Sequence, residues 1–183
     1  MKKKTNFRWL VKIVLISIAA SLMFTLVSSE ILGRAGYIVA FATLAVFIVI
    51  GIGFDVIGVA VTAAQEAPFH SMAVRRERGA TDALRLIKNA DKTASFCSDV
   101  VGDVSGIVSG STAALIAARL MERMDNESFL FPLLISGVVT GVMIGGKAAG
   151  KTMAFNNSTK IMLNVGKLIH ALHLKPHTKK RGQ

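Results

Sequence analysis

The stretch that decides the fold is Tyr37–Ala64, YIVAFATLAVFIVIGIGFDVIGVAVTAA, in which Asp55 is the only charged residue. An α-helix needs about 20 consecutive apolar residues to cross the hydrocarbon core of a bilayer. β-Strands rarely exceed about ten residues, so a run of this length is too long for a strand. The stretch therefore predicts a membrane-spanning helix that is long enough to tilt.

Three further apolar runs have the same character. They cover Trp9–Val27, Ser95–Ala118 and Ser128–Ile144, and the last can extend through Ala149 to Lys151. Of all 183 residues, 52% are apolar, which is high for a soluble domain. We therefore expect an all-α polytopic membrane bundle of four transmembrane helices. The third run is the least apolar because it contains two aspartates.

The basic residues predict how these spans are oriented. Most of the lysines and arginines precede the first span, lie between the second and third, or follow the fourth. The other two loops contain only Arg34, Arg119 and Arg123. Loops rich in Lys and Arg stay in the cytoplasm. We therefore expect a multi-pass protein of the plasma membrane, such as a bacterial inner membrane, with both termini cytoplasmic.

The first span has an alternative interpretation as a cleaved signal peptide. Lys2, Lys3 and Lys4 precede the apolar run, and Ser28 and Ser29 follow it. This layout resembles a secretory signal, but the apolar part is long and no clear small-x-small cleavage site follows. We expect the span to be kept, and cleavage would leave three spans in the same orientation.

Two segments outside the spans have apolar residues at helical spacing with basic residues between them. They are Glu66–Lys92 and Asn156–Leu174. We expect amphipathic helices on the cytoplasmic membrane surface, with Pro68 separating the first from the preceding span. Lys175–Gln183 is expected to be a disordered basic end. The basic residues fit attraction to anionic lipid, whereas nucleic-acid binding lacks interleaved aromatic residues.

No motif in the chain supports an enzyme. Gly145–Thr152, GGKAAGKT, fits the phosphate-loop pattern, but that loop must follow a strand of a parallel sheet, and here it follows a membrane span. His170, His173 and His177 fit a surface helix better than a metal cluster. Cys97 is the only cysteine, so an intrachain disulfide is excluded. We expect neither catalysis nor nucleotide binding.

Glycines recur every four residues in the third and fourth spans. Such ridges let helix backbones approach closely, and they favour a compact bundle or a homodimer face. The two ridges consist of Gly102, Gly106 and Gly110, and of Gly137, Gly141 and Gly145.

Four charged residues fall inside or at the ends of the spans: Asp55, Asp99, Asp103 and Lys147. A charge at a helix centre costs ~2.5–3.5 kcal/mol on insertion scales, so these side chains should face the bundle or a water-filled cavity. Asp99 and Asp103 are four residues apart and share a helix face.

These carboxylates permit two interpretations. Together with the Thr62, Ser98 and Ser105 hydroxyls they make an oxygen-rich cluster of the kind that Mg²⁺ prefers. Alternatively, one aspartate forms a buried ion pair with Lys147, which satisfies both charges without any ion.

Four short motifs resemble those of a known family. Thr62–Ala67, TAAQEA, resembles S-A-x-E-x-A, and Arg78–Lys92 resembles the following R-G-A…A-L-x-L…P-D-x segment. Phe96–Val104, FCSDVVGDV, is similar to L-I-G-N-T-L-V-N-I, and Gly146–Ala154, GKAAGKTMA, to G-E-I-x-P-K-T-L-A. These patterns belong to the transmembrane (DUF21) domain of the cyclin M and CorB/CorC magnesium transporter family. The resemblance covers roughly residues 45–170.

The resemblance implies a homodimer with three membrane helices per subunit, cytoplasmic juxtamembrane helices and Mg²⁺ transport. It implies a Mg²⁺ site of small polar side chains and backbone carbonyls, which in this chain places the candidate metal ligands at Thr62, Ser98, Asp99, Gly102 and Asp103. The chain then divides into residues 1–36 with an additional first span, 37–174 as the DUF21-like domain, and 175–183 as a basic tail.

The chain departs from the family pattern at charged positions. Gln65 replaces a glutamate, Asp99 and Asp103 replace asparagines, and Lys147 replaces a glutamate. No nucleotide-binding CBS domains follow, so nucleotide regulation is not expected. Two hypotheses result: a divalent-cation (Mg²⁺) transporter or Mg²⁺-binding domain, and a non-transporting membrane scaffold in which an Asp–Lys pair replaces the ion site.

Overall fold

The computed structural model describes residues 7–34, 36–124 and 130–173, and within these ranges the chain is helical without strands. The predicted basic tail and His177 lie outside the described residues. In chain order the elements are α1 (Phe7–Arg34), α2 (Tyr37–Ala63), α3 (Glu66–Val74), α4 (Ala80–Lys88), α5 (Ala90–Ala94), the π-helix η1 (Ser95–Asp103), α6 (Val104–Met124) and α7 (Leu130–His173).

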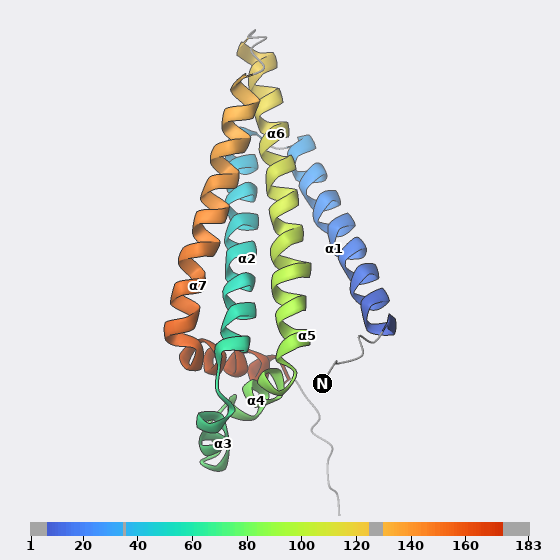
Figure 1. The fold of residues 1–183 in the computed structure, drawn as a ribbon. Helices are drawn as coiled ribbons and strands as arrows, with labels where there is room; N and C mark the ends of the chain where they lie inside the picture. Colours follow the sequence, from blue (N-terminus) through green and yellow to red (C-terminus); the bar gives the residue numbers. More distant parts are fainter. Residues whose placement is uncertain (1–6, 35, 125–129, 174–183) are drawn as a thin grey trace, which may run out of the picture.

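The predicted all-α membrane bundle is confirmed. Four helical stretches are long and apolar enough to cross a bilayer, namely Phe7–Glu30, Tyr37–Ala63, Ala90–Glu122 and Leu130–Leu172. Helices α2, α6 and α7 pack against one another, and α1 leans against the α6 side of this group (Figure 1). The four spans form because each buries its backbone polar groups in its own hydrogen bonds, as hydrocarbon requires.

The predicted ends of the spans were less accurate. The third span starts earlier, because α5, η1 and α6 follow one another without a break from Ala90. The fourth continues beyond Ile144 to Asn157, whose φ of −123° and ψ of 23° bend the helix. After this bend α7 turns and runs across the end of the bundle that carries α3 and α4 (Figure 1). We call this end the base.

Pro68 does not make the break that the sequence predicted. Helix α2 ends at Ala63, and the extended residues Ala64 and Gln65 separate it from α3. Pro68 lies in the first turn of α3, where a helix does not need the missing N–H group. The break therefore precedes the proline by several residues.

The amphipathic helices are present, but their apolar faces contact protein. Phe69 of α3 and Ala83 of α4 are 0% exposed, and they share a core with Val61, Ala154 and Met162. The sequence predicted that these faces would lie on the membrane surface. A basic amphipathic pattern fits either environment, and here the segment of α7 after Asn157 covers the apolar residues.

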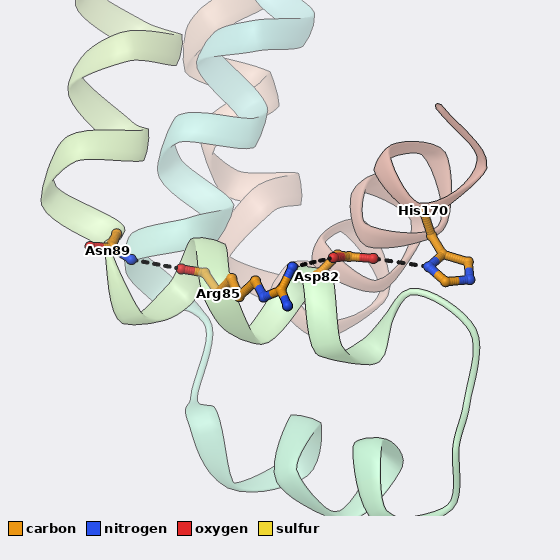
Figure 2. Close-up of polar contacts among 4 residues, drawn as sticks. All are labelled: Asp82, Arg85, Asn89 and His170. Atoms are coloured by element: carbon orange, nitrogen blue, oxygen red, sulfur yellow. Dashed lines mark hydrogen bonds and ion pairs between the residues drawn. The ribbon is translucent and has the colours of Figure 1, made fainter. Parts of the chain in front are cut away.

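A chain of polar contacts joins α4 to this last segment of α7 (Figure 2). Asn89 Nδ2 donates to the Arg85 carbonyl at 3.1 Å, and Arg85 Nη1 lies 3.4 Å from Asp82 Oδ1. The other oxygen of Asp82 lies 3.1 Å from His170 Nδ1. His170 therefore helps to hold the base together.

Candidate intramembrane ion site

Asp55 is the most deeply buried acidic residue within the described ranges, although it lies inside the α2 span, two turns before the helix ends at Ala63. It is 5% exposed, and its Oδ2 atom has no hydrogen-bond partner. Helical spacing places Gly51 and Gly58 one turn to either side of it, and both are buried. Asp55 thus has a glycine on either side of it on the buried face of α2, which Phe47 and Leu44 continue towards the other end of the helix.

These glycines let α2 approach η1 and the start of α6 closely. A Cβ atom at Gly51 would lie 3.1 Å from Ser105 Cβ and 3.4 Å from the Gly102 carbonyl oxygen. A Cβ at Gly58 would collide with the Ser98 hydroxyl. Gly102 lies opposite Asp55, because a Cβ there would be 3.7 Å from Asp55 Cβ. The two backbones are therefore in near contact around the carboxylate.

Ser105 supplies a second unsatisfied oxygen to this interface. It is 0% exposed, and its hydroxyl has no hydrogen-bond partner in the described part of the chain. Since Ser105 faces Gly51, it lies about one helical turn from Asp55 along the same interface. Buried polar groups in proteins are nearly always hydrogen-bonded, so these two oxygens are the candidate binding atoms of this interface.

The helix that faces Asp55 is irregular. Ser95–Asp103 forms a π-helix directly continuous with α6. Such segments are rare and are frequent at functional sites. Its residues Ser98 and Gly102 pack against Gly58 and Gly51 of α2. The π-helical segment therefore lies next to the Asp55 carboxylate.

The five predicted metal ligands have different surroundings in the structure. Thr62 is exposed, and its hydroxyl donates to the Val59 carbonyl of its own helix at 2.8 Å. Asp99 is exposed, whereas Ser98 and Gly102 face α2. Asp103 points towards α7. Across the ranges that the structure describes, no three Asp, Glu, His or Cys side chains come together as a group that could hold a metal ion.

Asp103 forms the ion pair that the sequence left open as an alternative. Lys147 Nζ lies 2.9 Å from Asp103 Oδ1, and the lysine side chain is 19% exposed while the aspartate is 64% exposed. The pair lies in a groove of about 370 Å³ between α6 and α7, with Gly106, Thr140 and Met143 among its lining residues. The lysine therefore occupies the position at which a cation would neutralise Asp103.

Only part of the two predicted glycine ridges makes close contacts. Gly102 meets α2, and a Cβ at Gly106 would lie 3.4 Å from Met143 Cε. Cβ atoms at the other four positions would have no neighbour within 4 Å in the single chain; these are Gly110, Gly137, Gly141 and Gly145. Helix α7 approaches α2 closely through two other glycines, Gly146 and Gly150, which face Ile52 and Val56 of α2.

The sequence singled out Asp55 as an intramembrane charge without assigning it to the ion site. The signal that could have done so is the pattern of small residues around it, with Gly51 and Gly53 before and Gly58 after it. The sequence placed Ser105 in the oxygen-rich cluster of Asp99 and Asp103, but its position against Gly51 of α2 depends on the rotation of the third span and needed the structure.

No family model matches this chain, and no curated protein and no solved structure shows significant similarity to it. The resemblance to the CorB/CorC transmembrane domain therefore stays a prediction from four short motifs, and the geometry around Asp55, Asp103 and Lys147 must support any function by itself.

Proposed function

We propose that this chain moves a small cation across the bilayer and that Asp55 is the group that binds it. The observation that carries the proposal is the burial of this carboxylate inside a membrane span, where Oδ2 has no partner among the residues that the structure describes. A lone charge at a helix centre costs ~2.5–3.5 kcal/mol, and acids inside membrane helices typically mark ion pathways or proton relays. Binding of a proton or cation removes this cost.

The surroundings of Asp55 suit a proton or Na⁺ better than Mg²⁺. Mg²⁺ demands octahedral oxygen geometry and keeps several of its waters. The close approach of Gly51 and Gly102 beside the carboxylate leaves little space for such a hydrated ion. A proton needs only Asp55 itself, and Na⁺ can use Asp55, the Ser105 hydroxyl and backbone carbonyls.

Release of the cation to either side requires the interface between α2 and η1 to open. Glycines on both faces leave few interlocking side chains to separate. We propose that opening towards the base leads to the cytoplasm, because the exposed residues Arg75, Arg78 and Lys160 lie at that end. The exposed glycines of α7 support assembly as a homodimer in the plasma membrane.

The second candidate function is a membrane scaffold that does not transport. The ion pair between Asp103 and Lys147 favours it, because the pair neutralises an acidic position where the family resemblance implies an ion ligand. Mg²⁺ transport through Asp99 and Asp103 is the remaining alternative, and one experiment separates all three.

The experiment measures flux into sealed liposomes that contain the purified chain. Separate runs impose gradients of protons, Na⁺ and Mg²⁺, with a matching fluorescent indicator inside. We expect the wild type to carry protons or Na⁺ faster than empty liposomes, and Asp55→Asn to abolish this flux. Asp99→Asn is the matched control, since it neutralises an exposed acid of η1, and it should keep wild-type flux.

Three results contradict the proposal. Flux that survives Asp55→Asn in a normally folded protein excludes this carboxylate as the binding group. A Mg²⁺ flux that is lost in Asp99→Asn or Asp103→Asn moves the site to the positions implied by the resemblance. Wild-type liposomes that conduct none of the three ions favour the scaffold.

A further inference from the structure

A separate basic cavity lies between the start of α1 and α5. It has a volume of about 580 Å³, and the described residues that line it are Phe7, Arg8, Trp9, Lys12 and Lys92. Three of these five side chains are cationic and none is acidic. The cavity is remote in sequence from Asp55, and it does not depend on the cation site.

The fold itself brings these charges together. Arg8 and Lys12 lie one turn apart on α1, whereas Lys92 comes from α5, at the start of the third span. All three cationic residues are exposed, and like charges that surround one volume repel each other. An anion inside the basic cavity removes the repulsion. Three cations suit a group with more than one acceptor oxygen, such as a phosphate.

The position of the cavity points to a lipid as the source of that phosphate. Trp9 is the only tryptophan of the chain, and tryptophan is enriched where membrane helices reach the headgroup region. Leu15 and Ile16 follow Lys12 by three and four residues, lie on its face of α1, and are 61% and 45% exposed. The cations therefore sit at the end of an apolar surface, as a headgroup sits above its acyl chains.

Helix α1 lies closer to α6 in its second half than at its start (Figure 1). Its second half is attached to the bundle by a 2.7 Å hydrogen bond between the Ser28 and Thr112 hydroxyls and by the edge-to-face contact of Phe24 with Phe47. Towards Phe7 the helix diverges from α6 (Figure 1). The basic cavity lies at the start of α1, where the two helices are further apart.

We propose that the basic cavity binds the headgroup of an anionic phospholipid. Arg8, Lys12 and Lys92 hold the phosphate, with the Arg8 guanidinium able to donate two parallel hydrogen bonds. An acyl chain lies against Leu15 and Ile16. The lipid thereby joins α1 to the start of the third span at the membrane surface.

The test compares lipids that stay bound to the detergent-purified protein. Wild type is incubated with equal amounts of phosphatidylglycerol and phosphatidylcholine with the same acyl chains, and the lipids retained after gel filtration are quantified by mass spectrometry. Because three cations converge on one headgroup in the basic cavity, we expect retention of phosphatidylglycerol to exceed that of phosphatidylcholine by about tenfold or more. Arg8→Gln/Lys12→Gln/Lys92→Gln should lose this preference.

The matched control is Arg75→Gln/Arg78→Gln/Lys160→Gln, which removes the same charge from exposed positions elsewhere at the base and should keep the preference. The single variant Lys92→Gln leaves α1 unchanged and should weaken the preference for phosphatidylglycerol. It provides the test if the triple variant fails to fold. Equal retention of both lipids by the wild type, or an unchanged preference in Lys92→Gln and the triple variant, overturns the proposal. Competition by millimolar inorganic phosphate as effective as that of the lipid also overturns it, since the site would then recognise free phosphate.

Discussion

Lys147 of α7 donates a hydrogen bond to Asp103 at the end of η1, with 2.9 Å between Nζ and Oδ1. The two residues are separated by 44 positions in the chain, so the contact joins the third and fourth spans. Because each charge alone is costly within a membrane, either residue without the other would leave an uncompensated charge in the groove between α6 and α7.

Removal of one member of this pair should therefore destabilise the bundle more than removal of both. We expect Asp103→Asn to lower the free energy of unfolding by about 2–4 kcal/mol, because Lys147 keeps its charge without a counter-ion. Asp103→Asn/Lys147→Met should recover most of this loss. Unfolding in mixed micelles with increasing SDS measures four proteins: the wild type, Asp103→Asn, Lys147→Met and the double variant. Additive effects of the two single substitutions would show that the pair contributes no coupling.

The ion pair also illustrates what the sequence could predict. The four spans followed from the length of the apolar runs, and the exchange of acid for base at Lys147 suggested a partner on the third span. The choice between Asp99 and Asp103 needed the structure, because the rotation of each helix decides which carboxylate reaches α7. The α2 helix is apolar on all sides, so its periodicity did not indicate that Asp55 faces η1.

The base of the bundle could be predicted only as a set of helices. Alternation of apolar and basic residues is equally compatible with lipid and with protein, so the cover provided by α7 was not predictable. Its bend at Asn157 has no proline or glycine to announce it. The contact between Gly79 and Gly166 that closes the base joins segments too distant in sequence for any local pattern.

Substitution of these two glycines should open the base. Gly79 has a φ of 82°, and a Cβ there would collide with the Lys167 backbone, while a Cβ at Gly166 would collide with the Gly79 carbonyl oxygen. We expect Gly79→Ala and Gly166→Ala each to lower the free energy of unfolding by about 1–3 kcal/mol. Amide hydrogen exchange of residues 158–173 should become faster, because this segment would no longer pack closely against the start of α4.

The matched control for this prediction is Gly110→Ala, in which the new methyl group has no neighbour within 4 Å. Alanine is the better helix former, so this change should be neutral or slightly stabilising. Equal exchange rates in Gly166→Ala and Gly110→Ala would show that the close contact at the base does not hold α7 in place.

The hydrogen bond between Ser28 and Thr112 should measure how firmly α1 is attached to the other spans. It is 2.7 Å long and buried. It links α6 to the second half of α1, away from the base. Hydrogen bonds between membrane helices typically contribute about 0.6 kcal/mol, so a double-mutant cycle of Ser28→Ala and Thr112→Val should give a coupling energy of that order. Ser29→Ala is the control, because its hydroxyl bonds only to the Leu26 carbonyl of its own helix. A coupling energy of zero, with Ser28→Ala and Ser29→Ala equally stable, would mean that α1 is held by apolar contacts such as Phe24 with Phe47 alone.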